Sequence, residues 1–240
     1  MVKVLVGCPT SETHKYCFKE YLEAVNNITF KDKKILLVDN SKTIDYFDFI
    51  KNSGIDVIKT HYTVSARDRI VRSRNILREF VLKEEYDYFL SLEQDVIPPK
   101  EVIERLLGHK KDIISGVYFS RIKSLTDKKV KVLPLLWTWK DGSNNPYSMA
   151  DVDLDLVMNN NVIKIKYCGL GCLLISRKVL EKVKFRYDDK YPTFDDLHFC
   201  QDARNNGFEI FVDTGVKCKH LIIKRPWYWD GNKEIQTFKK

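Results

Sequence analysis

The stretch Tyr86-Asp-Tyr-Phe-Leu-Ser-Leu-Glu-Gln-Asp95 is the most informative part of this sequence. Its residues 88–92 have the apolar composition of a buried strand, and Glu93 and Asp95 follow that strand directly. Two carboxylates one residue apart repel each other, so this position calls for a compensating positive charge. Mg²⁺ and Mn²⁺ prefer oxygen ligands and often share them with substrate phosphates. The stretch therefore predicts a metal site at the carboxyl end of a strand; acids that simply cap the next helix are the alternative.

The first half of the chain alternates strands with helices around this stretch. Runs rich in β-branched residues predict strands at 2–7, 34–38, 56–60, 88–92 and 112–118. Apolar residues at helical spacing predict helices at 12–26, 44–52 (stopped by Gly54) and 66–83, and another that reaches residue 107. This alternation is typical of an α/β fold with a mostly parallel, Rossmann-like sheet and helices on both faces. Ligands bind such sheets beyond the carboxyl ends of the strands.

The second half of the chain is less regular. Residues 121–162 are polar and predict a loop-rich insertion or acceptor-side region. Strands are expected at 162–167, 172–176, 209–212 and 216–219, and helices at 177–183 and 195–206, the last ended by Gly207. No segment has the composition of a linker, so we expect a single domain covering residues 1–240.

Charge and composition restrict the partners and the location. The 41 lysines and arginines exceed the 33 acids by eight and are spread along the chain, which indicates a solvated basic surface. Such a surface suits anionic substrates or an anionic membrane surface, whereas no motif predicts nucleic-acid binding. We find no signal peptide and no apolar run of about 18 residues, so we expect a cytoplasmic protein, with peripheral membrane contact as the alternative.

The cysteines predict reduced thiols. The six of them (8, 17, 168, 172, 200 and 218) form no paired framework. A zinc site that combines Cys168 and Cys172 with Cys218 and His220 is a minor alternative, because the chain has no Cys-x-x-Cys motif.

Three other groups of residues have chemical potential. Asp195 and Asp196 stand at a predicted helix start, where they either cap the helix or act as a general base with an orienting neighbour. His220 is a structural histidine or, together with a carboxylate and a diphosphate, a manganese ligand. The helix at 66–83 contains five arginines (67, 69, 72, 74 and 78). They form a solvated face, or one of them, for which Arg74 is our candidate, binds phosphate.

Polar residues and glycines complete the candidate site. Thr10, Asp39 and Asn40 follow the first two predicted strands, at the edge where ligands are expected. In Cys168-Gly-Leu-Gly-Cys172, Gly169 and Gly171 either allow the backbone to approach a ligand closely or form a tight turn.

In this order, the motifs resemble those of the nucleotide-sugar-dependent glycosyltransferases of the GT-A fold, and most closely the broad family-two type. The resemblance extends over residues 2–220. It rests on Arg74-Asn75, the strand end at 88–95, the segments 112–118 and 169–175, Asp195-Asp196, and the segment 207–220. The chain departs from the family at two positions, because the family has aspartate in place of Glu93 and glutamate in place of Asp195.

The resemblance implies transfer of a sugar from a UDP or GDP sugar to a hydroxyl of a glycan, lipid-linked or protein acceptor. Residues 1–120 would bind the donor, and residues 121–240 would bind the acceptor and carry the catalytic residues. Mn²⁺ or Mg²⁺ would be held by Asp95 and His220, with Glu93 as a third candidate. Asp196, beside Asp195, would be the base of an inverting reaction. The expected donor contacts are Thr10, Asp39, Asn40, Arg74, Gln94, Gly169 and Gly171.

Two alternatives remain open at this point. A sugar-phosphate nucleotidyltransferase also uses a metal and a similar sheet, but Gly7-Cys-Pro-Thr-Ser11 is a poor match for its glycine-rich phosphate loop. A non-catalytic nucleotide-sugar-binding module of the same fold would not need the acids Asp95 and Asp196. The aromatic tail at 227–229 is a candidate lid or sugar platform, or it packs the C-terminus onto the domain.

Overall fold

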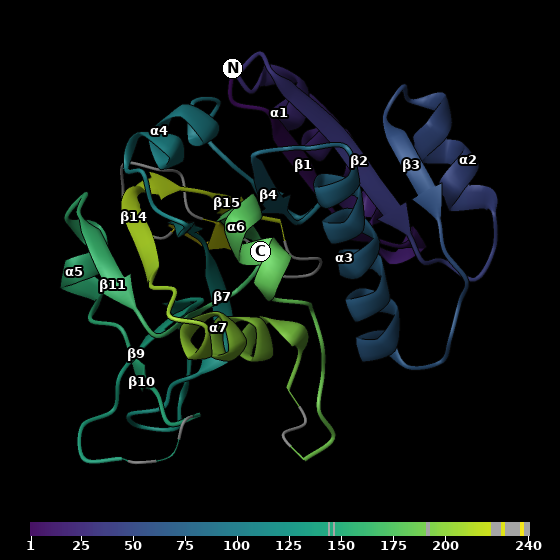
Figure 1. Ribbon diagram of the computed structural model, residues 1–240. Helices are drawn as coiled ribbons and strands as arrows, with labels where there is room; N and C mark the ends of the chain where they lie inside the picture. The colour runs from purple at the N-terminus through teal and green to yellow at the C-terminus, as the bar shows by residue number, and fades with distance from the viewer. Residues whose placement is uncertain (144, 146, 191–192, 222–226, 229–235, 238–240) are drawn as a thin grey trace.

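A mixed sheet forms the centre of the protein, as the computed structural model in Figure 1 shows. The structure describes residues 1–143, 145, 147–190, 193–221, 227–228 and 236–237, and in this part of the chain the sheet has eight strands. Their order is β11 (Val162–Ile165), β14 (Ile210–Lys217), β6 (Ile113–Val117), β13 (Cys172–Ser176), β4 (Tyr88–Leu92), β1 (Val4–Thr10), β2 (Lys33–Asp39) and β3 (Asp56–Lys59). Strands β3, β2, β1 and β4 are parallel, as are β6 and β14, whereas β13 and β11 are antiparallel to their neighbours. The predicted α/β class with a mostly parallel sheet is confirmed.

Helices cover both faces of this sheet because successive strand residues point to opposite sides. In β4, Phe89 packs into one apolar layer and Leu90 into the other. The first layer holds α3 (Ala66–Lys83), α6 (Arg177–Lys182) and α7 (Asp195–Asn205), and the second holds α1 (Phe18–Asn27), α2 (Asp45–Asn52) and α4 (Val102–Gly108). Figure 1 shows α3 and α7 in front of the sheet. In the described part of the chain, none of the helices has the length and apolar character to cross a membrane.

Local sequence signals set the helix ends. The Ser65 hydroxyl accepts a hydrogen bond from the Asp68 backbone N–H (3.2 Å) and caps the start of α3. Gly54 (φ 88°) and Gly207 (φ 82°) follow α2 and α7 in the left-handed conformation that glycine adopts without strain. Both glycine stops agree with the prediction. The predicted helix at 12–26 divides into a 3₁₀ turn η1 (Glu12–Cys17) and α1.

Several strand predictions were wrong in their bounds. β1 does not end at residue 7 but continues to Thr10, and beyond Gly7 it pairs with β2 while its pairing with β4 has ended. One side of the strand is therefore unpaired there, which allows Pro9 to occupy it without the loss of a ladder hydrogen bond. The strands predicted at 209–212 and 216–219 are one strand, β14, with an irregular register between Val212 and Lys217.

The segment 121–162, which was predicted as loop-rich, also contains short strands and a helix that were not predicted. It contributes to a hairpin of β7 (Phe119–Lys123) and β8 (Val130–Pro134), to β9 (Leu136–Thr138) and β10 (Ala150–Asp151), and to the short helix α5 (Leu154–Met158). β9 also pairs with β12 (Tyr167–Cys168). The hairpin strands are exposed along much of their length, so no continuous apolar run marks them in the sequence.

Short antiparallel pairings involve the described residues after β14. β5 (Val96–Ile97) pairs antiparallel with β15 (Lys219–His220), so residues directly after the acidic strand end lie beside His220. In the aromatic tail, β16 (Trp227–Tyr228) pairs with β17 (Gln236–Thr237). Trp229 lies outside the described residues, so the predicted lid remains a prediction.

Candidate active site

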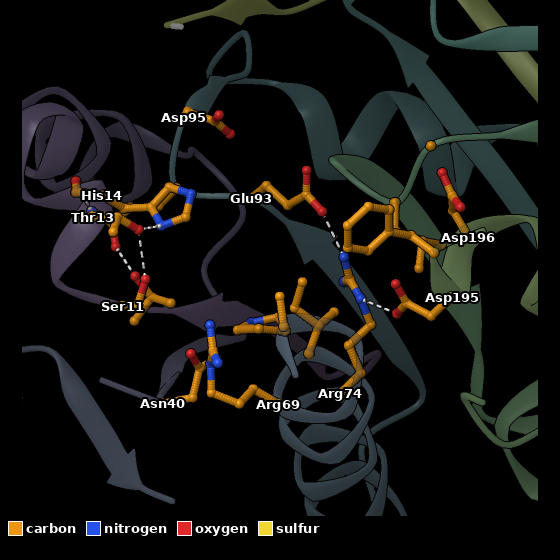
Figure 2. Close-up of a pocket in the computed structure, with 18 of the residues that line it drawn as sticks. Ser11, Thr13, His14, Asn40, Arg69, Arg74, Glu93, Asp95, Asp195 and Asp196 are labelled. Atoms are coloured by element: carbon orange, nitrogen blue, oxygen red, sulfur yellow. Dashed lines mark hydrogen bonds and ion pairs between the residues drawn. The ribbon is translucent and has the colours of Figure 1, made fainter. Parts of the chain in front are cut away.

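A pocket of about 390 Å³ opens at the carboxyl ends of the parallel strands. Because β1, β2 and β4 run in the same direction, the residues that end them meet at one edge of the sheet. The pocket is lined by residues of the β1 end and η1 (Pro9, Thr10, Ser11, Thr13, His14), of the β2 end and α3 (Asn40, Ala66, Arg69, Ile70, Arg74), of the β4 end (Glu93, Gln94, Asp95), and of later segments (Tyr118, Leu135, Gly169, Leu170, Phe194, Asp195, Asp196). The structure thus brings both predicted acid pairs into one pocket (Figure 2).

In the first acid pair, the two carboxylates have different partners. Glu93 Oε1 accepts a hydrogen bond from Arg74 Nη2 at 2.6 Å. Asp95 Oδ2 lies 3.3 Å from His220 Nε2. Burial alone would raise the pKa of Asp95, but His220 outweighs this effect and lowers that pKa; in turn, burial would lower the pKa of His220 and Asp95 raises it. Glu93 and Asp95 therefore have separate partners, Arg74 and His220.

Asp95 and His220 fit a divalent cation by their donor chemistry. His220 Nδ1 donates a hydrogen bond to the Phe119 carbonyl oxygen (2.7 Å), so in the neutral ring Nε2 carries the lone pair and faces Asp95. A backbone carbonyl at the other ring nitrogen is the usual way in which a metal-binding histidine is oriented. Within the described residues, no group of three or more His, Cys, Asp or Glu side chains is arranged for a metal ion. The protein would thus provide two ligands, and oxygens of a substrate diphosphate and water would complete the shell, as is common for Mg²⁺.

In the second acid pair, Asp195 and Asp196 begin α7 as predicted, but their environments differ. Asp195 is buried, and its Oδ2 lies 2.6 Å from Arg74 Nε. Asp196 is partly buried, and its Oδ1 accepts a hydrogen bond from the backbone N–H of Leu197 (2.8 Å). Burial, followed by the negative charge of Asp195, raises the pKa of Asp196 from 3.8 to about 7. Asp196 is therefore a carboxyl group that can exchange a proton near neutral pH.

Arg74 lies between the two acid pairs and contacts one member of each, as Figure 2 shows. The prediction had placed its guanidinium at a phosphate, whereas the structure pairs it with carboxylates. Other arginines of α3 also bind protein groups: Arg72 pairs with Asp68, and Arg78 Nε donates to the carbonyl oxygens of Leu180 and Val183. Much of the arginine-rich helix thus serves internal contacts.

Gln94 connects the elements that surround the pocket rather than pointing freely into it. The side chain is 1% exposed, and its Oε1 accepts from the Thr10 hydroxyl (2.5 Å) and from the Tyr46 hydroxyl (3.0 Å). Its Nε2 donates to the carbonyl oxygen of His14 at 2.7 Å. Gln94 therefore fixes η1 against the ends of β1 and β4.

The two residues predicted at the end of β2, Asp39 and Asn40, differ in whether they reach the pocket. Asn40 lines the pocket, and its Nδ2 donates to Ser73 Oγ at 3.3 Å. Asp39 is fully buried; its Oδ1 accepts from the Ser41 N–H and hydroxyl, and its Oδ2 lies 3.2 Å from Lys59 Nζ. Asp39 therefore organises the turn behind Asn40 and is not among the residues that line the pocket.

The two glycines before β13 accommodate a side chain of the protein. The Gly171 N–H donates to the Tyr118 hydroxyl at 2.8 Å. A Cβ atom at Gly171 would lie 2.6 Å from Tyr118 Cζ, and one at Gly169 would lie 2.1 Å from the Tyr118 hydroxyl oxygen. Both positions therefore require glycine because the ring of Tyr118 packs there. Gly169 lines the pocket, whereas Gly171 lies beneath that ring.

Several pocket residues were not selected from the sequence, among them His14, Arg69 and Phe194. His14 lies on η1, and Figure 2 shows it on the same side of the pocket as Asp95. Arg69 belongs to the arginine-rich helix, and its Nη1 donates to the carbonyl oxygens of Thr63 and Val64. Phe194 precedes the second acid pair and is 52% exposed at the pocket. An aromatic residue directly before two acids was the available signal for Phe194, whereas nothing local distinguished His14.

The cysteines lie outside this chemistry. All six are buried and free. Burial raises the pKa of Cys17 to about 12 and raises that of Cys8 further above its ordinary value. Buried thiols with raised pKa values are poor nucleophiles and poor metal ligands.

Comparisons with known proteins define the fold. No protein-family model matches the sequence, and no curated protein matches it. Among solved structures, A197 from STIV superposes with a TM-score of 0.50 at 16% identity, covering 100% of this chain and 95% of that chain. TarS from S. aureus superposes with a TM-score of 0.50 at 16% identity, covering 88% of this chain and 35% of that chain. At this identity the likeness concerns the fold, which is of the GT-A type.

Proposed function

We propose that this protein is a metal-dependent glycosyltransferase that moves a sugar from a UDP or GDP sugar to a hydroxyl group of a glycan, lipid-linked or protein acceptor. The observation that carries the proposal is the pocket in which Asp95, next to His220, and Asp196 occur together. The likeness of the fold to A197 and TarS supports glycosyl transfer in general terms. The donor base, the sugar and the acceptor are to be found by experiment.

In this proposal, Asp95 and His220 hold Mn²⁺ or Mg²⁺ through an oxygen and an imidazole nitrogen. The bound cation would neutralise the charge that develops on the departing diphosphate. Asn40 and the backbone that ends β1 border the space for the nucleoside. Glu93 and Arg74, which pair with each other, contribute no direct ligand in this scheme.

Asp196 is the proposed base for an inverting reaction. A carboxyl group with a pKa of about 7 is partly ionised at neutral pH and still basic enough to remove a proton as the hydroxyl attacks. An ordinary carboxylate with a pKa near 4 would be a weaker base under the same conditions. The raised pKa therefore supports Asp196, rather than Asp195, as the group that receives the proton.

Calorimetric titration with UDP and GDP tests the donor and metal parts of the proposal. We expect binding to strengthen when Mn²⁺ is present and to weaken at least about tenfold in Asp95→Ala, because a metal ligand is lost. Asp141→Ala is the matched control, since Asp141 is exposed and not among the residues that line the pocket. Binding that ignores Mn²⁺ and is unchanged in Asp95→Ala would refute the metal site.

A screen of nucleotide sugars with Mn²⁺ present then distinguishes a glycosyltransferase from a nucleotidyltransferase and from a non-catalytic binding module. A glycosyltransferase releases the nucleoside diphosphate, slowly with water as acceptor and faster with the correct acceptor. A nucleotidyltransferase would instead release pyrophosphate from a nucleoside triphosphate and a sugar phosphate. A non-catalytic module would bind the nucleotide and release neither product.

A further inference from the structure

Arg74 contacts one acid of each pair that lines the pocket. Its Nη2 donates to Glu93 Oε1 at 2.6 Å, and its Nε lies 2.6 Å from Asp195 Oδ2. Its Nη1 donates to the Ser91 hydroxyl at 2.8 Å, and that hydroxyl donates to the Leu170 carbonyl oxygen at 2.6 Å. Three nitrogens of one guanidinium group thus contact a residue of β4, the residue that follows β4 and the first residue of α7, as Figure 2 shows for the two acids.

This arginine is buried together with the acid that begins α7. The Arg74 side chain is 3% exposed and that of Asp195 is 4% exposed, whereas Glu93 is 34% exposed. A buried guanidinium without partners would be strongly unfavourable, and so would several unpaired carboxylates around one pocket. Although burial opposes the charged form, Asp195 and Glu93 raise the pKa of Arg74, so the group is a permanent cation.

In each acid pair, Arg74 contacts the first acid and leaves the second acid to other partners. In both pairs the first acid, Glu93 or Asp195, is bound by Arg74. In both pairs the second acid has other neighbours: Asp95 lies beside His220, and Asp196 accepts from a backbone N–H.

We infer that Arg74 is a positioning residue that joins the two acid pairs into one unit, holds Glu93 and Asp195 as structural members, and leaves Asp95 for the cation and Asp196 for the acceptor proton. The inference rests on the proposed function for the roles of the second acids. The coupling between Glu93 and Asp195 through Arg74 follows from the contacts and does not depend on those roles.

The two acids together contain one glutamate and one aspartate. Glu93→Asp would withdraw its carboxylate from Arg74 by one methylene, and Asp195→Glu would push its carboxylate toward Arg74 by one methylene. Each single exchange disturbs the guanidinium, and the double exchange restores the combined reach while it keeps every charge. A bridge through Arg74 therefore predicts that each exchange compensates for the other.

A double-mutant cycle with Glu93→Asp, Asp195→Glu and the double variant tests this inference. We expect each single exchange to lower nucleotide-sugar turnover by about 10- to 100-fold, as for the loss of an orienting partner, and the double variant to return to within about threefold of the wild type. Losses that multiply in the double variant would show that the acids act independently and would overturn the inference. Rescue by the second exchange requires that the two acids are coupled, whether the single exchanges lower turnover directly or through stability.

Isosteric variants test the division between first and second acids. We expect Glu93→Gln to retain Mn²⁺-strengthened UDP or GDP binding, and its matched variant Asp95→Asn to lose it. We expect Asp195→Asn to retain measurable transfer, and its matched variant Asp196→Asn to lose transfer while it still binds the nucleotide. The reverse pattern within either pair would overturn the inference.

Unfolding free energies in urea, measured for the wild type, both single variants and the double variant, test the bridge independently of the proposed function. If the wild type shows no Mn²⁺-dependent nucleotide binding, the proposed function fails. Non-additive unfolding free energies for Glu93→Asp and Asp195→Glu would still support the bridge, and additive values would refute it. Arg74→Lys, which keeps the charge but loses the fork of donors, is expected to abolish the non-additivity.

Discussion

Asp196→Asn is expected to stabilise the folded protein above neutral pH even though it removes the proposed base. The pKa of Asp196 rises from 3.8 to about 7 on folding, chiefly through burial and then through the charge of Asp195. One pKa unit corresponds to about 1.4 kcal/mol, so ionised Asp196 opposes folding by up to about 4 kcal/mol. Asparagine keeps an oxygen for the hydrogen bond from the Leu197 N–H and carries no charge. Because the helix start favours an acid by up to about 1 kcal/mol, which asparagine does not gain, we expect a net gain of about 3 kcal/mol.

The size of this stabilisation depends on pH. The folded state holds the proton of Asp196 more tightly than the unfolded state, so between pH 3.8 and about 7 the contribution of Asp196 to the stability of the wild type falls as the pH rises. Below that window the wild-type side chain is protonated in both states and resembles asparagine. The advantage of Asp196→Asn should therefore be absent at pH 4, grow through pH 5 and 6, and reach its full size above pH 7.

Urea unfolding at pH 4.5, 6 and 8, followed by circular dichroism, measures this difference. Asp195→Asn is the matched control, because it removes the ion pair with buried Arg74 and should destabilise the protein by about 3 kcal/mol. Replacement of these two adjacent acids would thus change the unfolding free energy in opposite directions. An Asp196→Asn variant that is no more stable than the wild type at pH 8, or a gain that is the same at every pH, would refute the assigned environment of Asp196.

Further predictions concern activity and packing. The rate of sugar transfer should rise about tenfold per pH unit below pH 7 and level off above it, because only ionised Asp196 accepts the proton; a profile that is flat from pH 5 to 8 would contradict this. Gly171→Ala should cost about 1 to 3 kcal/mol of unfolding free energy, because its Cβ would lie 2.6 Å from Tyr118 Cζ, whereas Gly108→Ala, with nothing within 4 Å, is the control that should stay within about 1 kcal/mol. Gln94→Leu should cost about 1 to 3 kcal/mol by the same measurement and weaken nucleotide binding, since its hydrogen bonds hold η1 at the pocket; unchanged stability would show that these bonds contribute nothing.

Much of the architecture could be predicted from local sequence. The apolar run before Glu93 and the alternation of strands and helices indicated a mostly parallel sheet, because burial on both faces leaves a continuous apolar signal. Gly54 and Gly207 marked helix ends through their backbone freedom. The exposed strands β7 and β8 were missed because only part of each is buried. The continuation of β1 through Pro9 was missed because it depends on which neighbour ends first.

The site was predictable in its location more than in its contacts. Parallel strands end at one edge, so Thr10, Asn40 and Asp95 were expected there, and all three line the pocket. Asp39, equally polar and at the same edge, is instead closed off by Ser41. Burial of one side chain and exposure of its neighbour depend on the packing of several elements, which no local pattern records.

The sequence alone determined that an acidic strand end, a second acid pair and a parallel sheet occur in one chain, since strand composition and helix signals act over a few residues. The tertiary structure alone decided how the acids are divided. The pairing of β5 with β15 brings His220 to Asp95, and the packing of α3 against α7 places Arg74 between Glu93 and Asp195. These contacts join residues that are far apart in the chain, so the same acids could have been paired differently by another arrangement of the same elements.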